Sequence, residues 1–244
     1  MSPTLTGRPA AGLRRGLGGA NPLIRVPRLY LALARRRHGD RVLGPRTDIM
    51  IEGYPRSANT FAVAAFEMAQ ERPVTVAHHL HAAAHVVAAV EAAVPVILLV
   101  RRPEDAIASV VARKPSVDAA LAARTYLRFY DGVADVLDGC VVAEFGDVVG
   151  DFGRVIERTN ARFGTSFTPF VHTEENVRRC FAEIEAGNRA RSGAAGVAEA
   201  AVARPSEERA RTAAEARARV AALPPELRRS LTRRYETTVA RGTA

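Results

Sequence analysis

Residues 48–61, which read DIMIEGYPRSANTF, decide the fold that this sequence predicts. The segment 48–52 reads as a β-strand, and the segment 59–70 reads as a helix. Between them lies a turn made of glycine, small residues and hydroxyl-bearing residues. Such a turn directs several backbone N–H groups and a helix N-terminus at one point, so it favours the binding of a phosphate.

Strands and helices continue to alternate on the C-terminal side of this turn. Further strands are predicted at 74–77, 95–100 and 140–144, and helices at 82–93, 103–112, 117–137 and 151–163. The segment 95–100 is uniformly apolar and rich in branched residues, which is typical of a strand buried on both faces. The alternation predicts an α/β fold, in which helices cover both faces of a parallel sheet and ligands bind beyond the carboxyl ends of the strands.

The two ends of the chain have a different character. Residues 1–46 are basic, and their first part, 1–22, is rich in Gly, Pro and Arg, so we expect a partly disordered extension with a short helix at 27–38. Residues 47–244 are expected to form one α/β domain, whose last part, 204–244, is a helical appendage. Helices are predicted at 172–187, 206–222 and 225–240, with a loop at 187–196.

The composition is that of a globular protein without a membrane span. Of the 244 residues, 48% are hydrophobic, and the longest apolar runs fall far short of the ~20 residues that a spanning helix needs. The pair Arg14-Arg15 is not followed by an apolar segment, which argues against a signal peptide. The two cysteines, Cys140 and Cys180, lie far apart, which favours a reducing compartment and argues against a structural zinc site. A cytoplasmic location is therefore expected.

The net charge of +9 is concentrated at the two ends of the chain. Residues 1–46 contain ten arginines and one acid, and 204–244 contain ten arginines and five glutamates, whereas 47–203 have an acidic excess. This distribution argues against a protein whose whole body binds nucleic acid. The simplest interpretation is a set of solvated arginine faces, and the alternative is a weak contact between the basic N-terminal region and an anionic membrane.

The turn after the first strand differs from the loop that binds nucleoside triphosphates. In the pattern G-x-x-x-x-G-K-[ST], Gly53 and Thr60 are in register, but Ala58 replaces the second glycine and Asn59 replaces the lysine. The only cation in the turn is Arg56. The turn is therefore poorly suited to the hydrolysis of Mg-ATP but still suited to a phosphate.

Residues 55–61, PRSANTF, resemble the motif P-[KR]-S-G-[TNS]-T-[WF] of the sulfotransferases, which use 3′-phosphoadenosine 5′-phosphosulfate (PAPS). The resemblance implies a sheet of the P-loop type, a catalytic Arg56 that binds the 5′-phosphate and the bridging oxygen, and a Phe61 that lies near the adenine. It also implies N–H and hydroxyl donors from Ser57, Ala58, Asn59 and Thr60. Ala58 stands where the family has glycine, and because alanine tolerates a positive φ less well, we expect the backbone of the turn to shift slightly.

A second segment, residues 101–109, reads RRPEDAIAS and is similar to the sulfotransferase signature R-[ND]-P-x-D-x-x-x-S. The resemblance implies that Arg101 and Ser109 bind the 3′-phosphate. The pattern agrees with this role, because Arg101 ends a predicted strand, and Asp105 and Ser109 share one face of the following helix. Arg102 replaces the usual Asn or Asp, which adds charge and removes no ligand.

Three histidines follow the second predicted strand in the segment 77–81, AHHLH. Metal binding is one interpretation, but strand alternation would turn His79 away from its two neighbours, and no other metal-type cluster is evident. The segment resembles K-T-H-L-P of the cytosolic sulfotransferases, which implies that His79 is the catalytic base; His81 or a carboxylate remains the alternative. Ala77 replaces the family's lysine, which removes a contact to the leaving group and gives more of that role to Arg56.

Two further segments resemble the family less closely. Residues 145–147, FGD, are similar to Y-E-D, which implies that Phe145 contacts the adenine. Residues 191–196, RSGAAG, are similar to the late segment R-K-G-x-x-G, which implies that Arg191, Ser192 and Gly193 close over the 3′-phosphate. The whole resemblance spans residues 48–196.

The resemblance implies a sulfotransferase that moves a sulfuryl group from PAPS to a hydroxyl or amine, with no metal. Small-molecule, sugar and lipid acceptors all remain open, as does the oligomeric state. Residues 81–90 and 113–130 are the expected source of the acceptor pocket. One alternative function is a P-loop kinase for a small molecule, and the other is a non-catalytic nucleotide-binding protein whose basic ends dock on an anionic surface.

Overall fold

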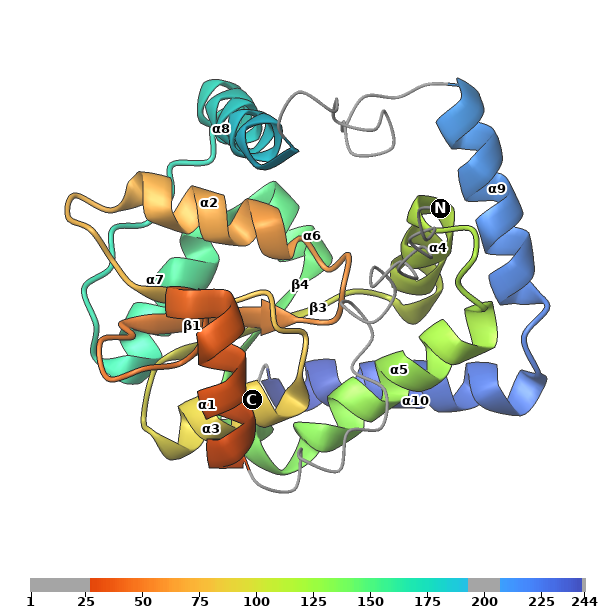
Figure 1. The fold of residues 1–244 in the computed structure, drawn as a ribbon, viewed down its shortest axis with the longest axis horizontal. Helices are drawn as coiled ribbons and strands as arrows, with labels where there is room; N and C mark the ends of the chain where they lie inside the picture. The colour runs from red at the N-terminus through yellow and green to blue at the C-terminus, as the bar shows by residue number, and fades with distance from the viewer. Residues whose placement is uncertain (1–26, 193–206, 243–244) are drawn as a thin grey trace, which may run out of the picture.

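The computed structural model describes residues 27–192 and 207–242 (Figure 1). At its centre lies a four-stranded sheet whose strands all run parallel, in the order β2-β1-β3-β4. The strands are β1 (Ile49–Gly53), β2 (Val76–His78), β3 (Val96–Val100) and β4 (Val141–Glu144). The predicted α/β class with a parallel sheet is therefore confirmed.

The strand order places the carboxyl ends of β1 and β3 at the centre of one edge of the sheet. From β1 the chain passes to β2 on one side, and β3 and β4 then follow on the other side. The register pairs Gly53 with Leu99, so both central strands end at the same level. Ligands of open α/β sheets bind where the direction of winding reverses in this way, which is between β1 and β3.

One face of the sheet is covered by α2 (Asn59–Ala69), α7 (Phe152–Phe163) and α8 (Glu174–Ser192). Apolar side chains from alternate positions of the strands pack against these helices, including Ile49, Ile51, Ile97 and Leu99. Figure 1 shows α2 and α8 on the same side of the sheet. The short helix α6 (Phe145–Gly150) connects β4 to α7.

The other face carries α3 (Ala83–Glu91), α4 (Pro103–Arg113), α5 (Ala119–Gly132), the 3-10 helix η3 (Ala134–Gly139), α9 (Glu207–Ala221) and α10 (Pro225–Gly242). Its core contains Met50 and Leu98 of the central strands together with Val220 and Leu231 of the last two helices. The predicted C-terminal appendage thus shares the core of the α/β domain.

The described part of the predicted N-terminal extension also packs on the domain. The helix α1 (Pro27–His38) has the predicted bounds, and η2 (Gly39–Arg41) follows it. Leu31 packs against the core and Leu43 is buried in it. The prediction for 1–22 lies outside the described residues.

Three predicted elements differ from the structure. The helix expected at 117–137 is broken, because α5 ends at Gly132 and the chain continues as η3. The strand expected at 74–77 lies at Val76–His78. The loop expected at 187–196 is helical up to Ser192, since α8 runs through Gly187; an ion pair between Glu185 and Arg189 spans that glycine and supports the helix.

Candidate functional site

The turn after β1 is held by contacts that bring its backbone close to β3. A Cβ atom at Gly53 would lie 2.5 Å from the carbonyl oxygen of Leu99, so glycine is required at this point. Tyr54 is fully buried and its hydroxyl donates to the carbonyl of Ala122 at 3.0 Å. The amide of Asn59 donates to the carbonyl of Tyr54 at 3.0 Å, which closes the turn.

Ala58 and Arg56 both adopt the left-handed backbone conformation, with φ of 67° and 71°. The turn therefore holds alanine in a conformation that glycine adopts more easily, and the slight shift expected relative to a glycine-containing turn stays a prediction. A side chain in this conformation costs about 1–2 kcal/mol, and such strain is often found at functional sites.

The N-terminus of α2 opens at this turn without a side-chain cap. The first N–H groups of a helix have no acceptor within the helix, so a bound anion can take that place. Two buried polar atoms lie in the turn. The Ser57 hydroxyl is close to the hydroxyl of Tyr130, and the Asn59 amide oxygen has no hydrogen bond to the part of the chain described, so it needs a donor.

Two arginines and a serine that were predicted to bind phosphate lie together beyond β1 and β3. The guanidinium of Arg101 donates to the carbonyl of Arg56 at 3.0 Å, and Nε of Arg56 donates to Oγ of Ser109 at 2.9 Å. The Arg101 guanidinium lies over the ring of Phe145, 4.0 Å from its centre. The hydroxyl of Tyr126 donates to the Arg101 carbonyl at 2.8 Å. Four predicted site residues are thus brought into one cluster.

Burial lowers the pKa of Arg101, and the nearby charge of Asp105 acts in the opposite direction. Guanidinium groups nevertheless stay protonated in proteins, so Arg101 is a partly buried cation. A cation in such a place is poorly solvated, and a second negative charge would stabilise it.

The histidine segment after β2 turns sharply, so the strand alternation considered for His78, His79 and His81 does not apply to it. His79 and His81 have φ of 59° and 51°. Nε2 of His79 lies 3.1 Å from the hydroxyl of Thr60, and Nδ1 of His79 contacts Nδ1 of His78. His79 therefore reaches the turn that follows the neighbouring strand β1 (residues 53–60), which is called the phosphate-type turn below. Across the described ranges, no group of His, Cys, Asp and Glu is arranged to hold a metal ion.

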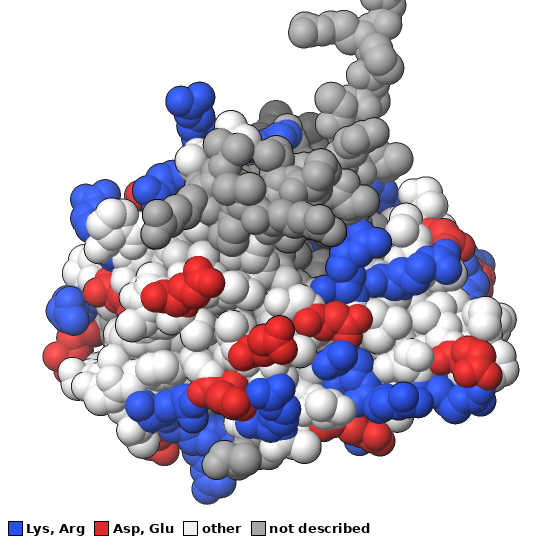
Figure 2. Space-filling view, turned by 90° about the horizontal axis from the view of Figure 1, so that it is seen from below, with Lys and Arg blue, Asp and Glu red and all other residues white. Residues whose placement is uncertain are grey.

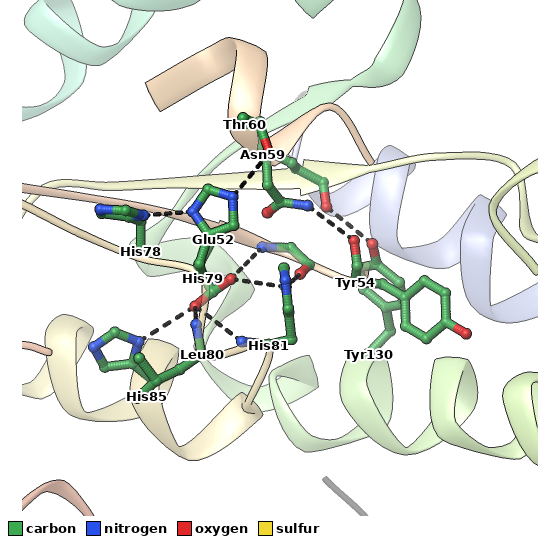
Figure 3. A network of polar contacts seen from close by, with 12 residues as sticks. Glu52, Tyr54, Asn59, Thr60, His78, His79, Leu80, His81, His85 and Tyr130 are labelled. Carbon is green, nitrogen blue, oxygen red and sulfur yellow. Dashed lines mark hydrogen bonds and ion pairs between the residues drawn. The ribbon is translucent and has the colours of Figure 1, made fainter. Parts of the chain in front are cut away.

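Sequence reasoning missed Glu52, whose side chain is fully buried beneath the histidine segment (Figure 3). Its carboxylate accepts hydrogen bonds from the backbone N–H groups of Leu80 at 2.8 Å and His81 at 3.1 Å. Nδ1 of His81 lies 3.3 Å from it, and Nδ1 of His85 lies 3.4 Å from it. The sequence offered one sign of this role, because Glu52 is the single ionisable residue in the otherwise apolar strand β1.

This network shifts the titration of its members in opposite directions. Burial by itself would raise the pKa of the Glu52 carboxyl, but hydrogen bonds from His81 and His85 hold that pKa well below its usual range. Burial would lower the pKa of His81, but the bond to Glu52 outweighs burial and the pKa of His81 is raised. Burial and the adjacent charge of His79 lower the pKa of His78 to about 3.

The remaining predicted residues lie elsewhere or outside the described part. Phe61 is only 6% exposed, and its ring packs against Phe170 and Phe181 at centre distances of 6.1 and 5.5 Å. Arg191 and Ser192 end α8, and the prediction for their side chains and for Gly193 falls outside the described residues.

In comparisons with known proteins, no family model, curated protein or solved structure matches this chain.

Proposed function

We propose that the chain is a P-loop sulfotransferase that moves a sulfuryl group from PAPS to a hydroxyl or amine. The observation that carries this proposal is the convergence of Arg56, Arg101 and Ser109 beside the open N-terminus of α2, with His79 in contact with the same turn. Two cationic side chains near one helix N-terminus suit a ligand with more than one phosphate.

The residues at the site fit a nucleotide that carries phosphates at both the 3′ and the 5′ position of its ribose. Arg101 and Ser109 would hold the 3′-phosphate, and Arg56 with the N–H groups of residues 57–60 would hold the 5′-phosphate. Phe145, which already lies beneath the Arg101 guanidinium, would meet the adenine. Asn59 stands where nucleoside triphosphatases have lysine, and its amide is bonded to the Tyr54 carbonyl, so the site is less suited to a γ-phosphate.

When bound, PAPS supplies the sulfuryl group, and the side chains of this chain handle protons and charge. An alcohol has a pKa of about 16 and scarcely ionises at neutral pH, so a base is needed. Nε2 of His79 would take the proton as the acceptor oxygen forms its bond to sulfur. The electron pair of the broken sulfur–oxygen bond stays on the departing phosphate, where Arg56 would stabilise the new charge.

The resemblance leads one to expect a lysine at position 77, where this chain has alanine. Ala77 lies in β2 and is fully buried in the core, so a cation is excluded from that place. Arg56 is exposed and its guanidinium is already near Ser109, which supports its role as the cation of the leaving group.

Calorimetric titration tests this proposal against its rivals. Adenosine 3′,5′-bisphosphate should bind much more tightly than adenosine 5′-monophosphate, and its binding should not need Mg²⁺. Equal affinities for the two nucleotides would overturn the proposal. Tighter binding of Mg-ATP would favour a small-molecule kinase, and bisphosphate binding without consumption of PAPS would favour a non-catalytic binding protein.

A cytoplasmic location with weak peripheral contact to anionic membranes completes the proposal. No helix in the described ranges is long and apolar enough to cross a bilayer. Arg35, Arg36 and Arg37 are exposed at the end of α1. The face seen in Figure 2 has basic and acidic side chains interspersed, which does not favour a broad nucleic-acid surface. Co-sedimentation with anionic and neutral vesicles at low salt tests the contact, and equal binding to both would exclude it.

A further inference from the structure

The carboxylate of Glu52 joins three segments that carry the candidate site. It belongs to β1, just before the phosphate-type turn, and one of its oxygens accepts the N–H of Gly53 at 3.1 Å. The other oxygen accepts the N–H groups of Leu80 and His81 in the loop after β2. A histidine of α3, His85, points at the same oxygen.

The hydrogen bonds indicate which ring nitrogens of His81 and His85 hold a proton. Nε2 of His85 accepts the N–H of Leu43 at 3.0 Å, so its proton lies on Nδ1 and the ring is a neutral donor to Glu52. Nδ1 of His81 lies 2.7 Å from the carbonyl of Gly53 and also faces Glu52, so it too holds a proton. The bond to Glu52 raises the pKa of His81, which favours a cationic ring beside the carboxylate.

The bonds to Glu52 act on the backbone that carries His79. His79 and His81 both have a positive φ, which residues with a side chain rarely adopt, and Leu80 between them is bonded to the carboxylate. This conformation turns the His79 ring toward Thr60. Donors face both oxygens of Glu52, and a glutamine amide would offer an oxygen to one set and an NH2 group to the other. Some of these N–H groups would then lose their acceptor, and the turn would open.

We infer that Glu52 is a positioning residue, which fixes the loop 79–81 and so holds His79 against the phosphate-type turn. The inference rests on the proposed role of His79 as the base. Glu52 does not touch the reacting atoms, because its side chain is fully buried and its contacts are all to the protein.

The test compares Glu52→Gln with Glu67→Gln, which removes a carboxylate from α2 outside this network. Glu52→Gln should speed the hydrogen exchange of the Leu80 and His81 amides by about 10-fold or more and should shift the ring signals of His79 in NMR spectra. Turnover should fall by about 10-fold or more, while the affinity for adenosine 3′,5′-bisphosphate stays within about 3-fold. Glu67→Gln should change none of these.

The outcomes separate this inference from the proposed function. If the wild-type protein does not consume PAPS, the proposed function fails, but amide exchange and the His79 signals still decide the role of Glu52. Wild-type exchange and wild-type turnover in Glu52→Gln would overturn the inference. If that variant does not fold, Glu52→Asp, which withdraws the carboxylate by one methylene, should show the same changes in smaller measure. Rapid exchange of the Leu80 and His81 amides in the wild-type protein would overturn the inference by itself.

Discussion

Nε2 of His79 lies 3.1 Å from the hydroxyl of Thr60, so the loop after β2 touches the first turn of the helix after β1. This contact places a histidine beside the turn where an anion is expected. It is possible because β2 is the immediate neighbour of β1 in the sheet.

The first prediction concerns the base. His79→Ala should lower the turnover of PAPS by about 10² or more, because proton transfer from the acceptor would lose its catalyst. The affinity for adenosine 3′,5′-bisphosphate should remain nearly unchanged, as measured by calorimetry. His78→Ala is the adjacent control and should cost less. A fully active His79→Ala protein would show that the base is another group, such as His81 or a carboxylate.

The second prediction separates the two phosphates. Arg101→Ala should weaken the binding of adenosine 3′,5′-bisphosphate by about 2–5 kcal/mol, since a buried charge contact would be lost. Binding of adenosine 5′-monophosphate should change little. Arg102→Ala is the matched control, because Arg102 is exposed and lies over Tyr235. Equal losses for both nucleotides would make Arg101 a structural residue.

The third prediction concerns the strained turn. Ala58→Gly relieves a left-handed alanine but gives the unfolded chain more freedom, so the two effects partly cancel. In the interior of α2, Ala64→Gly should cost about 1 kcal/mol. We expect the free energy of unfolding of Ala58→Gly to exceed that of Ala64→Gly by at least about 1 kcal/mol in urea denaturation. Equal losses at the two positions would mean that Ala58 is not strained.

The fourth prediction is a fall in stability as the pH decreases from about 6.5 toward 3. His78 has its pKa lowered from 6.5 to about 3 in the folded protein, so the unfolded chain binds more protons within that window. The low pKa of Glu52 adds to the effect. Its contribution to the free energy of unfolding is fully present above its ordinary pKa of 4.5, and it is lost as the pH falls through its pKa in the folded protein. His81, with a raised pKa, contributes fully below 6.5, and that contribution is lost as the pH rises through its folded pKa.

The free energy of unfolding should therefore be greatest near pH 6.5, which denaturant titrations at a series of pH values can measure. His78→Gln should reduce the difference between pH 6.5 and pH 4 by about 1 kcal/mol or more. An unchanged acid slope in His78→Gln would exclude His78 as its source.

The order of elements and the cluster of Arg56, Arg101 and Ser109 could be predicted from the sequence. Both arginines follow central strands, and the carboxyl ends of parallel strands meet at one edge of the sheet. The strand and helix bounds agreed to within one or two residues where apolar runs ended at Pro or polar residues, as at β3 and α4.

The contacts of Glu52 could not be predicted in the same way. They depend on β1 lying beside β2, on the register that pairs Ile51 with His78, and on two left-handed residues in the loop that follows. None of these features can be read from the local hydrophobic periodicity of the sequence. The extension of α8 through Gly187 was missed for a related reason, because the ion pair that spans the glycine depends on a helix already being formed.

The burial of Ala77 has a consequence for how this site could change over evolution. A lysine introduced there would place an ammonium group in the core that β2 shares with Met50, a substitution that is strongly unfavourable unless neighbouring residues change first. A cation at position 77 is therefore not reached by one tolerated substitution. Under the proposed function, a cation for the leaving group would be supplied more readily from the exposed turn that carries Arg56, so the packing of β2 restricts where such a cation can be placed.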